Sequence, residues 1–306
     1  MPDTLSILII TYNRPADLLE LLRNLSTQQR LDEVLEEVLI LNNASGISYK
    51  EVEEYIAATP RLKATYTYAD TNWGVARGRN ILMQQAKGSV FLTIDDDMVF
   101  PAPDAIYNLG QLFHQPFFKD ANTGIITFRV IYFDTKEVQL SAFPHKQYAK
   151  YVAKQQFLTA QFAGGANIMK REVIAKAGLF PVDFQYGMEE YDLLYRALSA
   201  GYTLGYDGSV TVEHKESPLG RQAGYKKLQM QWVNKSKVAW RYLPFVYFVG
   251  TAVAWSFQYL KVSRGHIGTW LQTWLQILRI PFTEKRHVVS KQTIQYLRRV
   301  EARLWF

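Results

Sequence analysis

The first 100 residues alternate between short apolar runs and stretches in which leucines recur every three or four positions. The run from Leu5 to Thr11 predicts a buried strand, and Pro15 stands at the start of a helix whose apolar positions are Leu18, Leu19, Leu22 and Leu25. Later apolar runs predict strands at 37–41, 64–69 and 90–94, with helices between them near 49–58 and 74–86. Strands that alternate with helices predict βαβ units in a mostly parallel sheet.

Polar loops follow four of these predicted strands. They read TYNR, NNAS, DTNWG and DDD. In a parallel sheet the carboxyl ends of the strands lie at one edge, where ligands bind. We therefore expect the four loops to converge on one crevice. Further on, residues 124–133 predict another strand, and residues 189–206 predict a helix, a glycine-containing turn and a strand.

Composition places the chain among ordered globular proteins. Its 306 residues are 48% hydrophobic and 21% charged, which suits one large α/β domain or one domain with an appendage. The absence of cysteine excludes disulfides and thiolate metal sites, and it fits a reducing compartment. The N-terminus has no basic segment before its apolar run, so it predicts a first strand rather than a signal peptide. A cytoplasmic location is the resulting expectation.

Three consecutive carboxylates, Asp95, Asp96 and Asp97, follow the predicted strand at 90–94. Like charges this close repel one another, and a bound divalent cation would reverse that repulsion. Mg²⁺ and Mn²⁺ prefer such oxygen ligands, and Asp95 and Asp97 are expected to point together while Asp96 turns away. The alternative is a turn in which one aspartate caps the helix of the following PAPDA segment. The sequence has neither a GK[ST] phosphate loop nor a Gly-x-Gly-x-x-Gly fingerprint.

Seven segments in this order resemble glycosyltransferase family 2: SILIITYNR, ILNNAS, NWGVARGRN, FLTIDDD, FAGGANIMKR, EEYDLLYRALSAGY and VEH. The resemblance covers roughly residues 5–215 and is of the rhamnosyltransferase-like kind. It implies a GT-A fold, which is a Rossmann-like α/β fold of nucleotide-diphospho-sugar transferases. It also implies an inverting hexosyltransferase, with Mn²⁺ or Mg²⁺ on the donor diphosphate and a carboxylate base for the acceptor hydroxyl.

The resemblance also assigns roles to the acidic residues. Asp97 matches the principal metal ligand, Asp95 matches a residue near the metal or the ribose, and His214 in VEH matches a second metal ligand. A purely structural role is the alternative for this histidine. The family base is the second member of a Glu-Asp-x-Asp pattern, and this chain carries Glu190 there. Glu189 also stays a candidate for the base, and helix capping is the alternative for both.

Donor-binding residues follow from the same motifs. The resemblance implies contacts from the first loop and from several later positions, namely Thr11, Tyr12, Asn13, Arg14, Asn42, Asn72, Arg79, Asp95, Asp96, Gly164 and Gly165. Asn42 stands where the family commonly has an aspartate that contacts uracil or thymine. Its amide can accept from or donate to a base, so cytosine stays open. The resemblance favours UDP or dTDP over GDP.

The C-terminal part differs in character from the rest. From Arg221 onward, 15 Lys and Arg face two Glu, and six of the seven tryptophans lie there. Residues 242–260 carry no formal charge, and one helical stripe contains Trp270, Leu271, Trp274, Leu275 and Leu278. We expect a GT-A domain at 1–220 and a helical extension at 221–306. The extension is expected to lie on the inner face of a membrane without spanning it, or alternatively to pack on the catalytic domain or a second copy.

These patterns together predict a sugar transfer to a glycan or a lipid-linked acceptor, in polysaccharide biosynthesis. Loops at 132–162 and 215–230 are expected to build the acceptor site, and an oligomer stays open. One alternative is a sugar-phosphate nucleotidyltransferase, although the Gly-rich N-terminal loop typical of those enzymes is absent. Others are a nucleic-acid-binding protein that uses the basic end, and a non-catalytic sugar-nucleotide sensor. The metal ligands and Glu190 have no role in nucleic-acid binding, so no nucleic-acid partner is expected.

Overall fold

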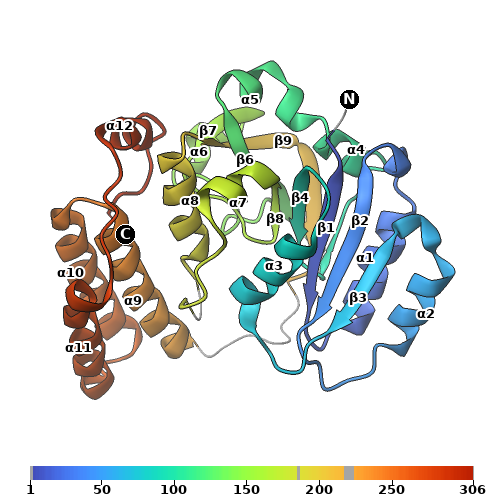
Figure 1. Cartoon of the computed structure of the whole chain (residues 1–306). Coiled ribbons are helices and arrows are strands. Elements are labelled where there is room, and N and C mark those ends of the chain that lie inside the picture. The colour runs from blue at the N-terminus through green and yellow to red at the C-terminus, as the bar shows by residue number, and fades with distance from the viewer. Residues whose placement is uncertain (1–2, 185–186, 217–223, 306) are drawn as a thin grey trace.

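The computed structural model describes residues 3–184, 187–216 and 224–305. A single mixed sheet forms the centre of the molecule, with strand order β3-β2-β1-β4-β8-β6-β9-β5 and with β7 paired to β9 (Figure 1). The strands are β1 (Leu5–Thr11), β2 (Leu35–Asn42), β3 (Ala64–Tyr68), β4 (Val90–Ile94), β5 (Met98–Val99), β6 (Thr123–Tyr132), β7 (Gln156–Thr159), β8 (Ala166–Lys170) and β9 (Thr203–His214).

The first half of the sheet is parallel, as the alternating pattern predicts. Strands β3, β2, β1 and β4 pair in parallel, and their loops follow Tyr68, Asn42, Thr11 and Ile94. The second half is mixed, because β8 runs antiparallel to both β4 and β6, while β6 and β9 pair in parallel. The predicted α/β class is confirmed, and the parallel arrangement stops at β4.

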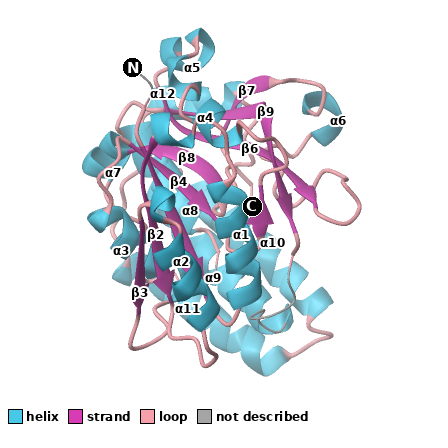
Figure 2. Cartoon of the chain, turned by 90° about the vertical axis from the view of Figure 1, so that its right-hand side faces the viewer, coloured by secondary structure: helices cyan, strands magenta, loops and turns pink. Residues whose placement is uncertain are grey.

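Helices cover both faces of the sheet (Figures 1 and 2). One face buries a core beneath α1 (Pro15–Ser26), α2 (Lys50–Ala58), α4 (Ala105–Leu109) and α5 (Pro116–Asp120). The other face lies beneath α3 (Gly74–Gln85), α7 (Arg171–Ala177) and α8 (Glu189–Ser199). The short helix α6 (Tyr148–Tyr151) and 3₁₀ turns at Leu31–Glu33, Pro60–Leu62 and Leu112–His114 complete this part.

Residues 224–305 form a helical unit, which we call the C-terminal extension (Figure 1). Its helices are α9 (Gly224–Tyr242), α10 (Phe245–Val262), α11 (Ile267–Thr283) and α12 (Lys291–Arg299). Pro244 precedes α10 directly. The extension shares one hydrophobic core with α8 and with the adjacent face of the sheet. The expected boundary at residue 220 lies outside the described residues.

The tryptophans of the extension lie differently from the expected membrane-facing stripe. Trp232 is fully buried and donates to the Ala252 carbonyl, and Trp270 and Trp274 both donate to Ser256 Oγ. The expected stripe therefore divides, since Trp270 and Trp274 turn inward while Leu271, Leu275 and Leu278 stay exposed. An indole N–H is a hydrogen-bond donor, and a partner inside the bundle stabilises its burial. None of the described helices is long and apolar enough to cross a membrane.

Candidate active site

The loops at the ends of β1, β2, β3 and β4 converge at one edge of the sheet. Thr11 pairs with Asn42, and Asn42 pairs with Tyr68, so these three strand ends lie in register. Asn13 then ties the first two loops together, because its backbone N–H donates to Ser45 Oγ and its Oδ1 accepts from the Gly46 N–H. The expected convergence of polar loops is confirmed.

Asp95, Asp97 and His214 form a compact group of metal-ligand atoms. One potential ligand atom from each lies within 4.8 Å of the other two. His214 reaches the aspartates because β9 ends at this residue and pairs with β5, the short strand just after the three aspartates. The Nε2 atom of His214 is 3.3 Å from Asp97 Oδ1. Two carboxylates and one imidazole suit Mn²⁺ or Mg²⁺, so the residues present fit such a cation.

Gln139 orients the histidine of this group. With Nδ1 protonated, His214 donates to Gln139 Oε1 at 2.8 Å, which leaves the Nε2 lone pair directed at the aspartates. Burial lowers the pKa of His214, but the Asp97 carboxylate opposes this, and the net pKa lies above the ordinary value. No sequence motif marks Gln139, because it comes from a loop whose position depends on the whole β6–β9 pairing.

Arg14 neutralises the inner two aspartates. Its Nη1 atom lies 3.1 Å from Asp96 Oδ1 and 3.1 Å from Asp97 Oδ2. Asp96 is buried, and burial raises its pKa to about 7 against the opposing effect of Arg14. Asp96 thus shares Arg14 with Asp97, whereas Asp95 and Asp97 belong to the metal-ligand group. A donor contact from Asp96 itself stays a prediction.

Arg79 connects the metal-ligand group to the candidate base. Its side chain is 6% exposed, with Nη2 3.6 Å from Asp95 Oδ1 and Nη1 3.4 Å from Glu190 Oε1. Gly164 and Gly165 pass so close to these groups that a Cβ at either position would overlap with Glu190 or Asp95. The Gly165 carbonyl also accepts from the Asp95 N–H at 3.1 Å. The two glycines therefore allow the backbone to approach the site closely.

Glu190 has the properties of a general base. It lies in the first turn of α8, its side chain is 20% exposed, and it lines a cavity. Burial and the neighbouring Glu189 raise the pKa of Glu190 to about 7, although Arg79 lowers it. A base with a pKa near neutrality is suited to accepting a proton in the middle of the pH range. Glu189 is buried, and its Oε2 has no hydrogen-bond partner within the described ranges.

The first loops are arranged around Asn42 and Tyr49. Asn42 is 1% exposed, and its amide accepts from the Ser45 N–H and donates to the Tyr66 hydroxyl. The Asn42 side chain therefore stabilises the loop through hydrogen bonds, and its burial leaves almost no surface for a nucleobase in this conformation. Tyr49, which no motif marks, bonds with Thr11 Oγ1 and accepts from the Arg14 N–H.

Three exposed aromatic rings surround this loop, namely Tyr12, Tyr68 and Trp73. The Tyr68 hydroxyl donates to the Ser45 carbonyl, and the Trp73 N–H donates to Asn43 Oδ1. Asn72 is exposed beside them and accepts from Asn43 Nδ2. Exposed aromatic rings of this kind offer flat surfaces on which a nucleobase can stack.

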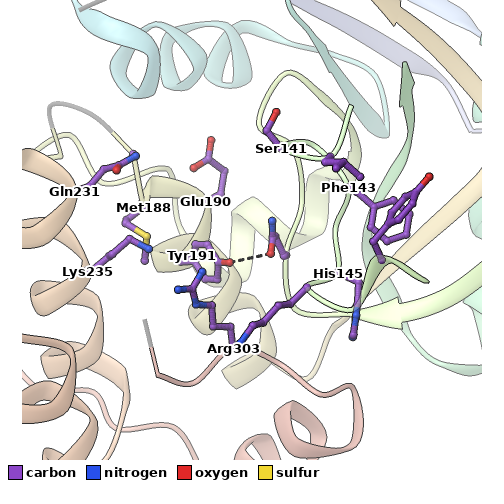
Figure 3. A pocket seen from close by; sticks show the side chains of 14 residues that line it. Ser141, Phe143, His145, Met188, Glu190, Tyr191, Gln231, Lys235 and Arg303 are labelled. Atoms are coloured by element: carbon purple, nitrogen blue, oxygen red, sulfur yellow. Dashed lines mark hydrogen bonds between the residues drawn. The ribbon is translucent and has the colours of Figure 1, made fainter. Parts of the chain in front are cut away.

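A cavity of about 600 Å³ lies beside Glu190 (Figure 3). Part of it comes from the expected region 132–162, through Leu140, Ser141, Phe143, His145, Lys146, Tyr148 and Gln161. Met188, Glu190 and Tyr191 of the α8 region form another wall, and Gln231, Lys235 and Arg303 of the extension close it. Part of the other expected acceptor region, 215–230, lies outside the described residues.

Comparison with known proteins identifies the catalytic part. Residues 6–178 match the family described as Glycosyl transferase family 2. An uncharacterized protein of Haemophilus influenzae is 24% identical over 179 residues, which are 58% of this chain and 94% of that protein.

Three solved structures illustrate the shared fold. A mannosyltransferase from Pyrobaculum calidifontis, in complex with GDP-Man and Mn²⁺, has a TM-score of 0.60 at 17% identity over 99% of this chain and 85% of its own. GalNAc-T7 with UDP, GalNAc and Mn²⁺ has a TM-score of 0.68 at 18% identity, over 98% of this chain and 57% of its own. S. aureus TarS 1–349 in complex with UDP-GlcNAc has a TM-score of 0.60 at 13% identity, over 99% of this chain and 89% of its own.

Proposed function

The chain belongs to glycosyl transferase family 2 and is a glycosyltransferase, and on that premise we propose how it works. It moves a sugar, with inversion, from a UDP or dTDP donor to a hydroxyl of a glycan or lipid-linked acceptor. One observation carries this proposal: Arg79 contacts both Asp95 of the metal-ligand group and Glu190 of the cavity. The donor diphosphate and the base for the acceptor would then meet at one arginine.

Asp95, Asp97 and His214 would hold the divalent cation, and Gln139 would orient His214. Such a cation, when bound, neutralises the charge that develops on the departing diphosphate. The neighbouring structures with Mn²⁺ support manganese, and Mg²⁺ is the alternative. Arg14 and Arg79 add positive charge on the same side, where the diphosphate would lie.

Glu190 would take the proton from the acceptor hydroxyl. As that O–H bond breaks, the oxygen forms a bond to the anomeric carbon, and the bond from this carbon to the diphosphate oxygen breaks. Attack from the cavity side, opposite the diphosphate, gives inversion. Glu189 is the weaker candidate for this role, because it is buried and Glu190 lines the cavity.

The membrane is the proposed site of action, because the extension has an apolar face that is exposed to solvent. On α10 this face consists of Phe245, Val246, Val249, Val253 and Phe257, and on α11 of Ile267, Leu271, Leu275, Leu278 and Phe282. Exposed Lys261, Arg264, Arg279 and Lys285 lie on or next to these two helices. Apolar helical faces with flanking basic residues are typical of proteins that lie on anionic bilayers. We propose that this face rests on the cytoplasmic leaflet, in polysaccharide biosynthesis.

Thermal-shift titrations with UDP, dTDP, GDP, CDP and ADP, each with and without Mn²⁺, test the donor proposal. A ligand at about a hundred times its dissociation constant adds about 2.7 kcal/mol to stability. We expect a Mn²⁺-dependent shift for UDP or dTDP that is absent in Asp97→Asn. A shift with GDP alone would identify guanine as the nucleobase of the donor. The absence of any shift would overturn the proposed donor site.

The family assignment favours a transferase over the nucleotidyltransferase and nucleic-acid-binding alternatives. A non-catalytic sensor would bind the donor equally well without Glu190. Consumption of the donor by the wild type, with loss of turnover in Glu190→Gln, excludes that role.

A further inference from the structure

The C-terminal extension supplies positive charge to the cavity beside Glu190. Lys235 of α9 and Arg303 of the final segment both line it, and Lys146 adds a third cation from the loop before α6. In Figure 3 the side chains of Lys235, Tyr191 and Arg303 gather below Glu190. The catalytic part thus provides the candidate base, while the extension provides two of the cations.

These cations outnumber the acidic groups of the cavity. Glu190 is the one carboxylate among the lining residues, against Lys146, Lys235 and Arg303. Within the part of the chain that the structure describes, neither Lys146 nor Arg303 lies at ion-pair distance from a carboxylate. Burial and the charge of Arg303 lower the pKa of Lys235 to about 8. The fold therefore holds the positive charges of Lys235 and Arg303 close together in one cavity, and a bound anion would stabilise this arrangement.

Two other cations of α9 form ion pairs with acidic side chains. Lys237 and Arg241, also on α9, both pair with Asp183 and Glu284 at 2.6 to 3.2 Å. Lys235 instead packs its ammonium 4.4 Å from the centre of the Trp255 ring and faces the cavity. Two cations of this helix thus pair with acids, whereas Lys235 lines the cavity.

We infer that this cavity binds the acceptor through a phosphoryl group, held by Lys235 and Arg303, while the reacting hydroxyl lies at Glu190. The inference rests on the proposed function, because it uses Glu190 as the base. Three cations against one carboxylate match a group that carries about two negative charges, as a phosphoryl group does. Tyr148, Phe143 and Tyr191 offer flat surfaces for the sugar rings of the same acceptor.

Calorimetric titration of the full chain tests the inference, with glucose 1-phosphate, glucuronate and glucose as probes. We expect the order glucose 1-phosphate, glucuronate, glucose, from tightest to weakest. The double variant Lys235→Gln/Arg303→Gln should bind glucose 1-phosphate at least tenfold more weakly than wild type. Lys291→Gln/Arg298→Gln, which removes two exposed charges elsewhere on the extension, should match wild type.

Asp97→Asn separates this site from the donor site. It should lose nucleotide binding with Mn²⁺ and keep glucose 1-phosphate binding, whereas the cavity double variant should show the reverse. Equal binding of glucose 1-phosphate by wild type and the double variant would overturn the inference. So would loss of that binding in Asp97→Asn. Either result leaves the donor proposal standing, since that proposal depends on nucleotide binding alone.

Two further probes distinguish the source of the phosphoryl group. Neutral phosphatidylcholine vesicles doped with a polyprenyl diphosphate represent a lipid-linked acceptor, and a soluble glycerol phosphate oligomer represents a phosphodiester polymer. Binding of the vesicles that is lost in the double variant identifies the lipid source. The same result with the oligomer identifies the polymer. If neither probe distinguishes the double variant from wild type, the inference is wrong.

Discussion

Arg241 of α9 donates from Nη1 to Asp192 Oδ2 at 2.8 Å, two residues after Glu190 on α8. Asp192 is 2% exposed and also accepts from Arg196 Nε and from the Tyr242 hydroxyl. On its other side Arg241 binds Glu284, beyond α11. The C-terminal extension therefore holds the helix that carries the candidate base, and sugar transfer should depend on an ion pair that touches no substrate.

Replacement of Arg241 should destabilise the whole protein. Arg241→Met leaves the buried Asp192 with one cation fewer, and loss of one partner from a buried pair costs about 3 kcal/mol. Urea unfolding should show this loss, and donor turnover should fall because Glu190 is less well held. Arg298→Met, at an exposed position on α12, is the control and should change stability little. An unchanged unfolding midpoint in Arg241→Met would show that the pair does not brace α8.

Glu190→Gln should abolish transfer while leaving donor binding intact. A positioned base contributes about 10² to 10⁴ in rate, so turnover should fall by that factor. The Mn²⁺-dependent thermal shift with the nucleotide should persist. A variant with normal turnover would move the role to Glu189, which Glu189→Gln would then test.

The rate should also depend on the ionisation of Glu190. Because its pKa lies at about 7 in the folded protein, wild-type turnover should rise between pH 6 and pH 8. The raised pKa has a cost in stability. The contribution of Glu190 to the free energy of unfolding is fully present below its ordinary pKa of 4.5, and it is lost as the pH rises through about 7. Glu190→Gln should therefore be at least as thermostable as wild type at pH 8.

Gln139→Leu should weaken the metal site without touching a ligand. The substitution removes the acceptor of His214 Nδ1, so the ring loses its fixed orientation. Loss of such an outer partner typically costs 10-fold to 100-fold in metal affinity. Mn²⁺ titration followed by electron paramagnetic resonance measures this directly, without any turnover. Gln139→Glu, which keeps an acceptor, should retain the affinity, and equal affinity in all three proteins would contradict the role of Gln139.

Gly165→Ala should displace the Asp95 side chain while changing the stability of the fold little. The added Cβ would overlap with the Asp95 carboxylate, which must then move away from Arg79 and His214. Nucleotide binding with Mn²⁺ should weaken at least tenfold, with a small change in the unfolding temperature. Gly46→Ala is the matched control, because its Cβ would meet no atom within 4 Å. Equal effects of the two substitutions would contradict the argument.

The apolar face of the extension should bind anionic vesicles. Phe257→Ser with Leu275→Ser should reduce flotation with vesicles that contain phosphatidylglycerol, because both side chains are more than half exposed. Flotation of the wild type should weaken at high salt as the basic flanks are screened. Dimerisation of the wild type that these substitutions abolish, without any flotation, would assign the face to a second copy instead.

The sequence by itself determined the elements and the catalytic motif. Hydrophobic period distinguishes strands such as β1 from helices such as α1, because side chains repeat every two residues in one and every 3.6 in the other. Parallel strand order then brings the carboxyl ends of the strands together, so the polar loops at Thr11, Asn42 and Asp95 indicate the site from the sequence alone. The match of Asp97 and His214 to family metal ligands depends on the order of motifs along the chain, which is itself a sequence property.

Only the tertiary structure decided which groups face which. Trp270 and Leu271 are neighbours on one predicted stripe, yet packing against α9 and α10 turns the indole inward and leaves the leucine exposed. The Asn42 amide accepts from the Ser45 N–H and donates to the Tyr66 hydroxyl, and its motif indicates neither bond. Lys235 and Lys237 lie two residues apart and differ in that one faces the cavity and the other pairs with acids. Such choices depend on contacts between distant segments, which local periodicity does not encode.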